Sequence, residues 1–405
     1  MTNEYRVVTA DDIEQLVDVE ARAFYNTSTP ERVELTRRLI PPDWTVAAFV
    51  DGRLVASVRS IPMVRRINGG GIGLGAVGPV ACLAEYRRQG HVGRLLRLAL
   101  ERMRDQGQAM SGLYTPHDAL YARYGWERAE GRKSYKFEPK SVQLRRKGAR
   151  GRIEKIGPDD WRRLDAVYRT YAEHRNGPFH RNEMWWREAV ITDHGATTRL
   201  REAQVWSDAS GADQGYVVYA NYPLASENRW PRQMVLIKDI VALTGDAYAG
   251  LWEHMLTHDL ADRIVVETPL DDPFRDMVED PWSVDVSVEG GAMLRIVDIE
   301  RAFAGRPYVG QAPVSFTMRI DDPTAPWNDG AWLVEAAEGS IRLGRTERTP
   351  DVELSANTLA PLFTAHMRPD VAASVGLLRV NRPQALTAMA QAFTAWYPPF
   401  CNDTY

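Results

Sequence analysis

The segment that decides the fold of this chain is Val77–Gly93, which reads VGPVACLAEYRRQGHVG. Its first seven residues predict a strand, and the residues that follow Gly90 predict a helix. The helix has one apolar face, formed by Val92, Leu95, Leu96, Ala99, Leu100 and Met103. The turn between strand and helix is basic, because it contains Arg87 and Arg88. This order of elements is typical of a pyrophosphate-binding turn.

The chemistry of such a turn comes from backbone amides. The first N–H groups of a helix lack intrahelical partners and carry partial positive charge. Gly90 and Gly93 allow a ligand to approach the backbone closely, and the arginines add charged donors. The alternative interpretation is a plain strand–helix connection with a solvated turn. The run Gly71–Gly75 predicts a glycine-rich hairpin, because it lacks the spacing of a dinucleotide fingerprint and no helix follows it.

A second segment supports a ligand-binding interpretation. Met110–Thr115 predicts a strand, and PHDALYARYGW follows at residues 116–126. The two segments resemble the GCN5-related N-acetyltransferases (GNAT), which hold acetyl-CoA with a strand, an Arg/Gln-x-x-Gly-x-Gly/Ala turn and a helix. Val92 departs from that pattern. An aliphatic residue after Arg-Arg-x-Gly is similar to one subfamily, the Eis-type (enhanced intracellular survival) acetyltransferases, whose domain order the whole chain resembles.

The resemblance implies acetyl-CoA as co-substrate and carries over its contacts residue by residue. The implied contacts are Val80, Ala81, Cys82, Arg88, Gln89, Gly90, His91, Val92, Gly93, Pro116 and His117. Tyr121 is implied as the general acid that protonates the departing CoA thiolate, since a phenol has a pKa of about 10. Without the resemblance, Tyr121 is a packed aromatic side chain on a short helix. Cys82 is interpreted as a core residue and not as a nucleophile.

The last ten residues, WYPPFCNDTY, are rich in proline and aromatics. Taken alone, they predict a segment packed on its own domain. In Eis-type enzymes a terminal aromatic residue places its α-carboxylate in the active site, and Tyr405 matches that position. This carboxylate is implied as the general base, although its ordinary pKa of about 3.3–3.7 has to be raised by burial. His117 is a rival base, because an imidazole pKa lies near 6.5.

Composition limits the class of protein. The 405 residues exceed one ordinary domain and predict two or three. A net charge of −4 does not favour a nucleic-acid partner. With only Cys82 and Cys401, neither a disulfide framework nor a cysteine metal site is expected, and we predict no metal. No apolar run approaches a membrane span and the start lacks a signal pattern, so we expect a cytoplasmic protein with no membrane partner.

The chain divides into three predicted domains. Residues 1–148 form a GNAT domain that binds acetyl-CoA. Residues 149–290 repeat the same strand–helix order without the basic turn, which predicts a degenerate second GNAT domain. Residues 291–405 form a domain that resembles sterol carrier protein 2. The fold class is therefore α/β and α+β: tandem GNAT folds, each a mixed twisted sheet with helices on both faces, followed by an α+β domain.

Two features of the second block have simple interpretations. The basic run at 140–152 predicts a solvated linker, because it lacks the interleaved aromatics of a nucleic-acid patch. His254 and His258 lie one helical turn apart, but Met255 stands where a metalloprotease motif requires glutamate. They are interpreted as packed or surface histidines.

The predicted function is acetyl-CoA-dependent transfer of acetyl to primary amines of a polyamine-type acceptor, aminoglycoside-like or a lysine amine. A cationic acceptor predicts an acidic and aromatic pocket. The candidates are Asp403, Glu183, Phe24, Tyr25, Trp185 and Trp186. The resemblance also implies a homohexamer. The alternatives are a carrier of lipids or other hydrophobic ligands and a non-catalytic scaffold that senses acetyl-CoA.

Overall fold

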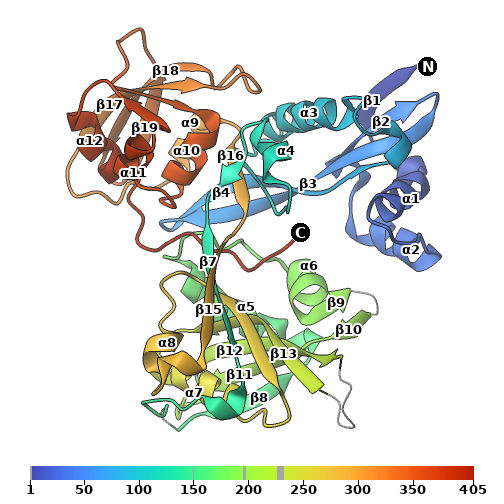
Figure 1. Ribbon diagram of the computed structural model, residues 1–405, viewed down its shortest axis with the longest axis vertical. Helices are drawn as coiled ribbons and strands as arrows, with labels where there is room; N and C mark the ends of the chain where they lie inside the picture. The colour runs from blue at the N-terminus through green and yellow to red at the C-terminus, as the bar shows by residue number, and fades with distance from the viewer. Residues whose placement is uncertain (1, 149, 195–197, 226–231) are drawn as a thin grey trace. The chain divides into compact units, whose positions relative to one another are not determined.

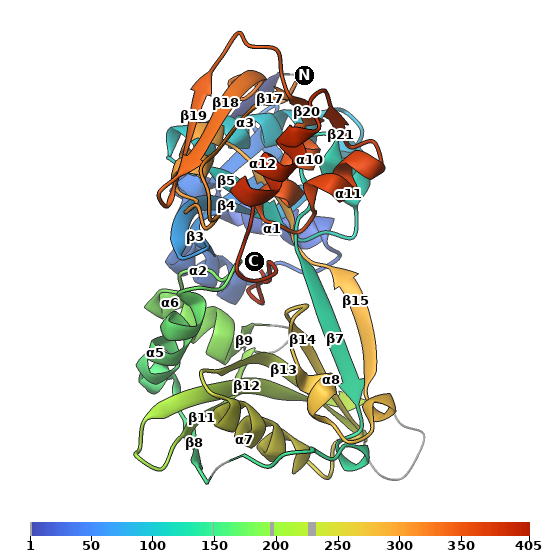
Figure 2. The ribbon, with the colours of Figure 1, turned by 90° about the vertical axis from the view of Figure 1, so that its left-hand side faces the viewer.

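The computed structural model describes residues 2–148, 150–194, 198–225 and 232–405. The chain forms two compact units. The first unit contains residues 1–129, 292–395 and Tyr405, and the second contains residues 130–291 and 396–404. Figure 1 and Figure 2 label the elements of both units.

The first sheet has seven strands in the order β1-β2-β3-β4-β5-β16-β6. The strands are β1 (Asn3–Val7), β2 (Thr45–Val50), β3 (Arg53–Ile67), β4 (Gly70–Cys82), β5 (Met110–Leu113), β6 (Glu127–Arg128) and β16 (Met293–Ile296). Its helices are α1 (Ile13–Ala23), α2 (Pro30–Leu39), α3 (His91–Asp105) and α4 (Asp118–Ala122). Only the β4–β5 pair is parallel.

Helices cover both faces of this sheet, as predicted. Val46 and Ala48 of β2 belong to the apolar cluster under α3, whereas Ala47 and Phe49 belong to the cluster under α1. Because alternate residues of a strand point to opposite faces, α1 and α3 lie on opposite sides. Strands β2 and β3 are joined by a tight hairpin at Asp51, with φ of 48° there and 82° at the following glycine.

The two central strands separate partway along their length. β4 pairs with β5 only through Leu74–Ala76, although it stays paired with β3 as far as Cys82. From Val77 onward, the edge of β4 that faced β5 is open. Pro79 lies in this stretch and has no N–H to offer a neighbouring strand. This opening is the central feature of the candidate site.

The second sheet also has seven strands, in the order β15-β7-β14-β13-β12-β11-β8. They are β7 (Gly131–Phe137), β8 (Arg152–Ile156), β11 (Glu202–Ser207), β12 (Asp213–Leu224), β13 (Arg232–Ala242), β14 (Arg263–Thr268) and β15 (Asp285–Gly290). Helices α5 (Trp161–Ala172) and α7 (Gly245–Leu256) pack on alternate residues of β12 and therefore on opposite faces. The shorter elements are α6 (Glu183–Trp185), α8 (Phe274–Met277), β9 (Thr192–His194) and β10 (Thr198–Leu200).

The third sheet has five strands in the order β19-β18-β17-β20-β21. They are β17 (Val314–Asp321), β18 (Gly330–Ala337), β19 (Ser340–Arg345), β20 (Val352–Ser355) and β21 (Leu378–Val380). Four helices accompany it: α9 (Ile299–Ala304), α10 (Ala356–Phe363), α11 (Pro369–Ser374) and α12 (Gln384–Ala392). Within the described ranges, no helix combines the length and the apolar character needed to cross a membrane.

The sheets differ from the domain boundaries predicted at 148/149 and 290/291. Strand β7 precedes the first boundary, yet it pairs with β14 and β15 in the second sheet. Strand β16 follows the second boundary, yet it pairs with β5 and β6 in the first sheet. A strand's own sequence sets which of its faces is buried, but it does not identify a partner that is more than a hundred residues away.

Candidate functional site

The basic turn ends in an open helix N-terminus. Gly90 precedes α3 with φ of 87°, a conformation that favours glycine, and nothing lies within 4 Å of the position a side chain would occupy. Arg88 also has a positive φ of 63° and is exposed. The amides of the first turn of α3 have no carbonyl four residues earlier within the helix to bond. The turn therefore presents a charged side chain and unpaired donors to an anion.

The other arginine of the turn has a different task. The Nε of Arg87 donates to the carbonyl oxygen of Cys82 at 3.2 Å, and its Nη2 donates to that of Ala23 at 3.5 Å. Gln89 also bonds within the turn, through its Nε2 and the carbonyl oxygen of Glu85. Arg87 and Gln89 thus hold the turn in shape, and Arg88 supplies the exposed charge.

Two predicted contacts of α3 have side chains committed to packing. His91 is 3% exposed, and its Nδ1 lies 2.8 Å from the Tyr5 hydroxyl, so its side chain belongs to the core. The Tyr124 hydroxyl occupies the space that a side chain at Gly93 would need. The sequence suggested that Gly93 admits a ligand, but in the structure its small size admits Tyr124.

Val80, Ala81 and Cys82 follow the point where β4 leaves β5. Ala81 is buried in the cluster under α1, while Val80 and Cys82 are half-buried on the α3 side. Their backbone pairs with β3 on one edge only. Burial raises the pKa of the Cys82 thiol, Arg87 lowers it and Glu85 raises it, with a net rise. A raised pKa keeps the thiol protonated, which agrees with the interpretation of Cys82 as a non-nucleophile.

A short turn carries the next predicted contacts from β5 to α4. Pro116 and His117 are exposed, and the backbone N–H of His117 donates to the Thr115 hydroxyl at 2.9 Å. The ion pair between Asp118 and Arg128 at 2.6 Å braces this turn, because Arg128 also donates to the Thr115 carbonyl oxygen. The hydrogen bond from Arg128 lowers the pKa of Asp118.

Tyr121 projects from α4 into the core below α3. It is 9% exposed and packs edge-to-face on Trp126, in the same apolar cluster as Val77 and Leu113. Burial raises the pKa of its phenol. In the part of the chain that the structure describes, its hydroxyl has no hydrogen-bond partner. Tyr121 is therefore a protonated donor next to the two strands that separate.

Tyr405 lies in the first unit at the opening between those strands. Its terminal carbonyl oxygen is 3.1 Å from the position that a Cβ would occupy on Gly78 of β4. Its hydroxyl is 2.7 Å from the corresponding position on Gly112 of β5. Its ring contacts that of Tyr114, with 5.4 Å between the centroids. The chain end thus occupies the start of the β4–β5 opening.

Sequence reasoning missed these two glycines and Tyr114. A glycine within a strand often marks a close approach of another group. Gly78 and Gly112 carried that signal, but nothing local indicated that the approaching group is the end of the same chain.

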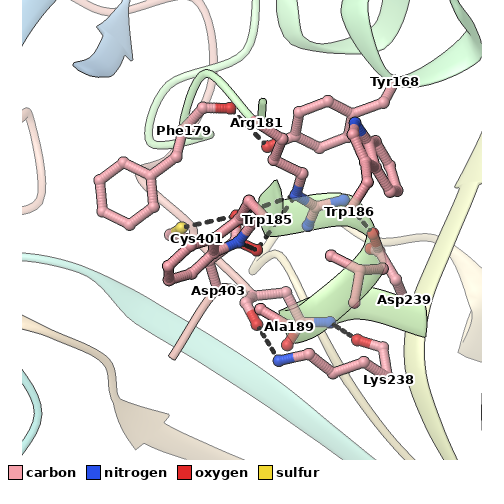
Figure 3. A network of polar contacts seen from close by, with 12 residues as sticks. Tyr168, Phe179, Arg181, Trp185, Trp186, Ala189, Lys238, Asp239, Cys401 and Asp403 are labelled. Carbon is pink, nitrogen blue, oxygen red and sulfur yellow. Dashed lines mark hydrogen bonds and ion pairs between the residues drawn. The ribbon is translucent and has the colours of Figure 1, made fainter. Parts of the chain in front are cut away.

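The predicted acceptor residues are divided between the two units. Phe24 and Tyr25 are 52% and 89% exposed at the end of α1. Trp186 is fully buried in the second unit, and Asp403, at 1% exposure, is buried there in an ion pair with Arg181. Figure 3 shows Trp185 and Asp403 in that same network. All three were expected at an acceptor pocket; Trp186 and Asp403 are buried within the second unit, whereas Trp185 is half-buried.

Two remaining predictions concern Glu183 and the histidine pair. Glu183 bonds Arg187 at 3.3 Å on the surface of α6. His254 and His258 pack with 5.5 Å between ring centroids, and burial and the neighbouring His258 lower the pKa of His254. Across the described ranges, no three metal-ligating side chains gather into a candidate site.

Comparisons with known proteins agree with this architecture. A family model for an acetyltransferase (GNAT) domain matches residues 4–129, a second model of that description matches residues 177–296, and a sterol carrier protein domain matches residues 299–402. An uncharacterized N-acetyltransferase of Streptomyces avermitilis is 26% identical over 99% of each chain. The N-acetyltransferase Eis of Mycobacterium tuberculosis is 22% identical over 96% of each chain.

The solved structures agree as well. Eis1 from Mycobacterium abscessus superimposes with a TM-score of 0.81 at 23% identity, covering all of both chains. The fold and the matched models define two GNAT domains followed by a sterol-carrier-like domain, and the protein is an acetyltransferase. The chain belongs to the Eis-like family of GNAT acetyltransferases, as the sequence predicted.

Proposed function

We propose that this acetyltransferase moves the acetyl group of acetyl-CoA to a primary amine of a small cationic acceptor, aminoglycoside-like or a lysine side chain. One observation carries the proposal. Tyr405 lies where β4 and β5 separate, beside Gly78, while Tyr121 packs in the apolar cluster that contains Val77, the residue of β4 before Gly78. A carboxylate and a protonated phenol are the two groups that direct acetyl transfer to an amine needs.

The turn before α3 supports acetyl-CoA as the co-substrate. Its exposed Arg88 and its first-turn amides suit a diphosphate, and the space beside Gly90 is open. The free edge of β4 over Val80–Cys82 suits the amide groups of a pantetheine arm, which pair with an unpaired strand edge. His117 and Pro116 stand exposed at the end of β5 on the same route.

The proposed reaction is a direct transfer. The amine nitrogen attacks the thioester carbonyl carbon, so that a C–N bond forms while the C–S bond breaks. The amine's proton passes to the α-carboxylate of Tyr405, and the phenol of Tyr121 gives its proton to the departing thiolate. Amides of β4 near Val80 polarise the carbonyl. The proton on the carboxyl group then returns to the phenolate through solvent, which leaves the acetylated amine and free CoA.

The alternative to Tyr405 as the base is His117, an exposed residue that directly precedes α4. The acceptor pocket has two remaining aromatic candidates, the exposed Phe24 and Tyr25, which suit stacking on a cationic ligand. The carrier and scaffold alternatives have less support, because two of the matching models describe acetyltransferase domains and the relatives are named N-acetyltransferases.

The test is thiol release from acetyl-CoA with a panel of polyamines, aminoglycosides and lysine peptides. It compares wild type, Tyr121→Phe, His117→Gln, a chain lacking Tyr405 and a chain extended by one glycine after Tyr405. We expect release with at least one amine, and loss of turnover in the Tyr121, deleted and extended variants. The extended chain keeps the tyrosine ring but moves the carboxylate. Equal turnover in wild type and in the extended chain would transfer the role of base to His117, and no release with any amine would end the proposal.

Two further expectations belong to this proposal and rest on the family resemblance. One is a homohexamer, which light scattering on the purified protein tests. The other is a cytoplasmic location, without nucleic-acid or membrane partners, which fractionation of the producing cells tests.

A further inference from the structure

The nine residues before Tyr405 are docked on the second unit. We call residues 396–404 the tail. The backbone N–H of Phe400 donates to the carbonyl oxygen of Asn176 at 2.9 Å, and the Asn176 side-chain amide donates to that of Tyr397 at 3.3 Å. Gly177 leaves no room for a side chain, because the backbone of Phe400 occupies that space. Arg175 also covers the ring of Tyr397, 4.2 Å from its centroid.

A buried ionic network holds the tail at Asp403 (Figure 3). The guanidinium of Arg181 donates from Nε to both carboxylate oxygens of Asp403 at 3.1 Å, and from Nη1 to Asp239 at 2.6 Å. The indole N–H of Trp185 donates to Asp403 at 2.8 Å. The side chains of Arg181 and Asp403 are each 1% exposed. Removing Arg181 would leave the buried carboxylate of Asp403 without its guanidinium partner, so burial of a charge at position 403 depends on this ion pair.

A second contact completes the charge balance. The ammonium of Lys238 donates to the backbone carbonyl oxygen of Asn402 at 2.7 Å. In return, the side-chain amide of Asn402 donates to the backbone carbonyl oxygen of Lys238. The network thus contains two basic side chains, the buried Arg181 and the half-buried Lys238, and two buried carboxylates, Asp239 and Asp403.

The tail lies in the opening of the second sheet. Strands β13 and β14 are parallel and pair only up to Ile237 and Val266, as β4 and β5 do in the first sheet. Beyond that point they line a cavity of about 190 Å³, together with Phe400, Cys401 and Asn402. The helix that follows β13 has no Arg-x-x-Gly turn before it. In the second domain, the place that corresponds to the predicted pantetheine site of the first is therefore shared with the chain's own tail.

We propose that the second GNAT domain has become the receptor for this tail, and that Arg181 and Asp403 are positioning residues for Tyr405. The inference rests on the function proposed above. Tyr405 follows Asp403 by two residues, and consecutive Cα atoms are about 3.8 Å apart. Fixing Asp403 therefore confines Tyr405 to within about 8 Å of the anchor. Without the anchor, the chain end explores a much larger volume and its carboxylate is rarely in place.

The experiment compares Asp403→Asn with Asp213→Asn in the full-length protein. Asparagine keeps the shape of Asp403 and the acceptor for Trp185 but removes the charge that faces Arg181. Asp213 is a matched control, because it pairs with Arg163 at 2.8 Å in the same unit and does not touch the tail. Asn402→Ala is a milder second variant, which keeps the ionic network and removes one tail contact. Two properties are measured: hydrogen exchange of the peptide covering 396–405, which contains the Phe400 amide, and kcat with the KM for acetyl-CoA.

We expect exchange of the tail to accelerate at least about 10-fold in Asp403→Asn, because local opening becomes easier. We expect kcat to fall by about 10-fold with the KM for acetyl-CoA within about twofold, because misplacing a reacting group costs rate more than binding. Asn402→Ala shows the same changes to a smaller degree, and Asp213→Asn shows neither. If Asp403→Asn does not fold, Asn402→Ala alone decides the question by the same two measurements.

Two results overturn the inference in different ways. Wild-type exchange or wild-type kcat in Asp403→Asn, with turnover still lost when Tyr405 is deleted, refutes the anchor and leaves the proposed function standing. Full turnover in the chain lacking Tyr405 refutes the catalytic role of the chain end, and the positioning role falls with it.

Discussion

The terminal carbonyl oxygen of Tyr405 lies 3.1 Å from the position that a Cβ would take on Gly78. The two residues are more than three hundred positions apart in the sequence, and Gly78 is the second residue of β4 beyond its last pairing with β5. A side chain at position 78 and the chain end in its present place compete for the same space. This relationship makes Gly78 a probe of the chain end.

We predict that Gly78→Ala reduces kcat by about 10-fold and that Gly78→Val reduces it further, because each pushes the carboxylate of Tyr405 from its place. The KM for acetyl-CoA should change little, since the turn before α3 is untouched. Steady-state kinetics with varied acetyl-CoA measures both. Gly344→Ala is the control, because Gly344 is an exposed strand glycine with nothing within 4 Å of a new Cβ. Equal kcat in wild type and in Gly78→Val would contradict a catalytic role for the Tyr405 carboxylate in its position beside Gly78.

The proposed general acid, Tyr121, gives a second prediction. Tyr121→Phe should lower kcat by about 100-fold or more, because proton donation to the leaving group contributes about 10²–10⁴. The hydroxyl makes no hydrogen bond to the described residues, so the thermal midpoint should stay near that of wild type. Tyr86→Phe is a matched control in the same apolar cluster. A large fall in stability with unchanged kcat would make Tyr121 a packing residue.

The pH dependence of turnover follows from the same phenol. Burial raises the pKa of Tyr121 above its ordinary value of about 10. A general acid acts in its protonated form, so a raised pKa keeps it active over the whole neutral range. The rate should rise with pH as the acceptor amine loses its proton. No decrease in rate is expected at pH values lower than about 10, because the phenol stays protonated there. Initial rates between about pH 6 and 10 test this, and a fall near pH 8 that disappears in Tyr121→Phe would contradict it.

Much of the fold could be predicted from local patterns. Helix α3 shows an apolar face, and positive-φ residues such as Asp51 mark the hairpins. The two strands that change sheets, β7 and β16, could not be assigned, because each pairs on both sides with strands that its own sequence does not identify. Burial of Asp403 was equally hidden. An aspartate near a chain end is normally exposed, and only its distant partner Arg181 makes burial tolerable.

The candidate site was predictable to a similar extent. The exposed Arg88 and the open Gly90 follow from the turn's sequence. The packing roles of His91 and Gly93 do not, because they depend on Tyr5 and Tyr124, which come from other elements.

The charge on the turn gives a third prediction. Arg88→Gln should raise the KM for acetyl-CoA by about 10-fold or more, because a hydrogen bond to a charged group is worth about 1.5–3 kcal/mol. The kcat should stay near wild type, and the effect should shrink as salt is added. Arg348→Gln is the control, because that arginine is exposed in the sterol-carrier-like domain. A salt-independent loss of kcat in Arg88→Gln would contradict a role in binding phosphate.

The last prediction concerns how the sterol-carrier-like domain contacts α4 and the turn that follows it. The side-chain amide of Asn357 in α10 donates to the carbonyl oxygens of Ala122 at 2.9 Å and Trp126 at 3.1 Å. These carbonyls flank the turn that follows α4, which carries Tyr121. Asn357→Ala leaves both without their donor, so the free energy of unfolding should fall by about 1–3 kcal/mol.

Because α4 then holds Tyr121 less firmly, kcat should fall more than the KM for acetyl-CoA rises. Denaturant unfolding and steady-state kinetics measure the two effects. Asn381→Ala is the control, since that side chain bonds Pro350 at the surface of the same domain and should cost less than about 0.5 kcal/mol. If Asn357→Ala lost stability but kept full kcat, the sterol-carrier-like domain would stabilise the first unit without positioning its general acid.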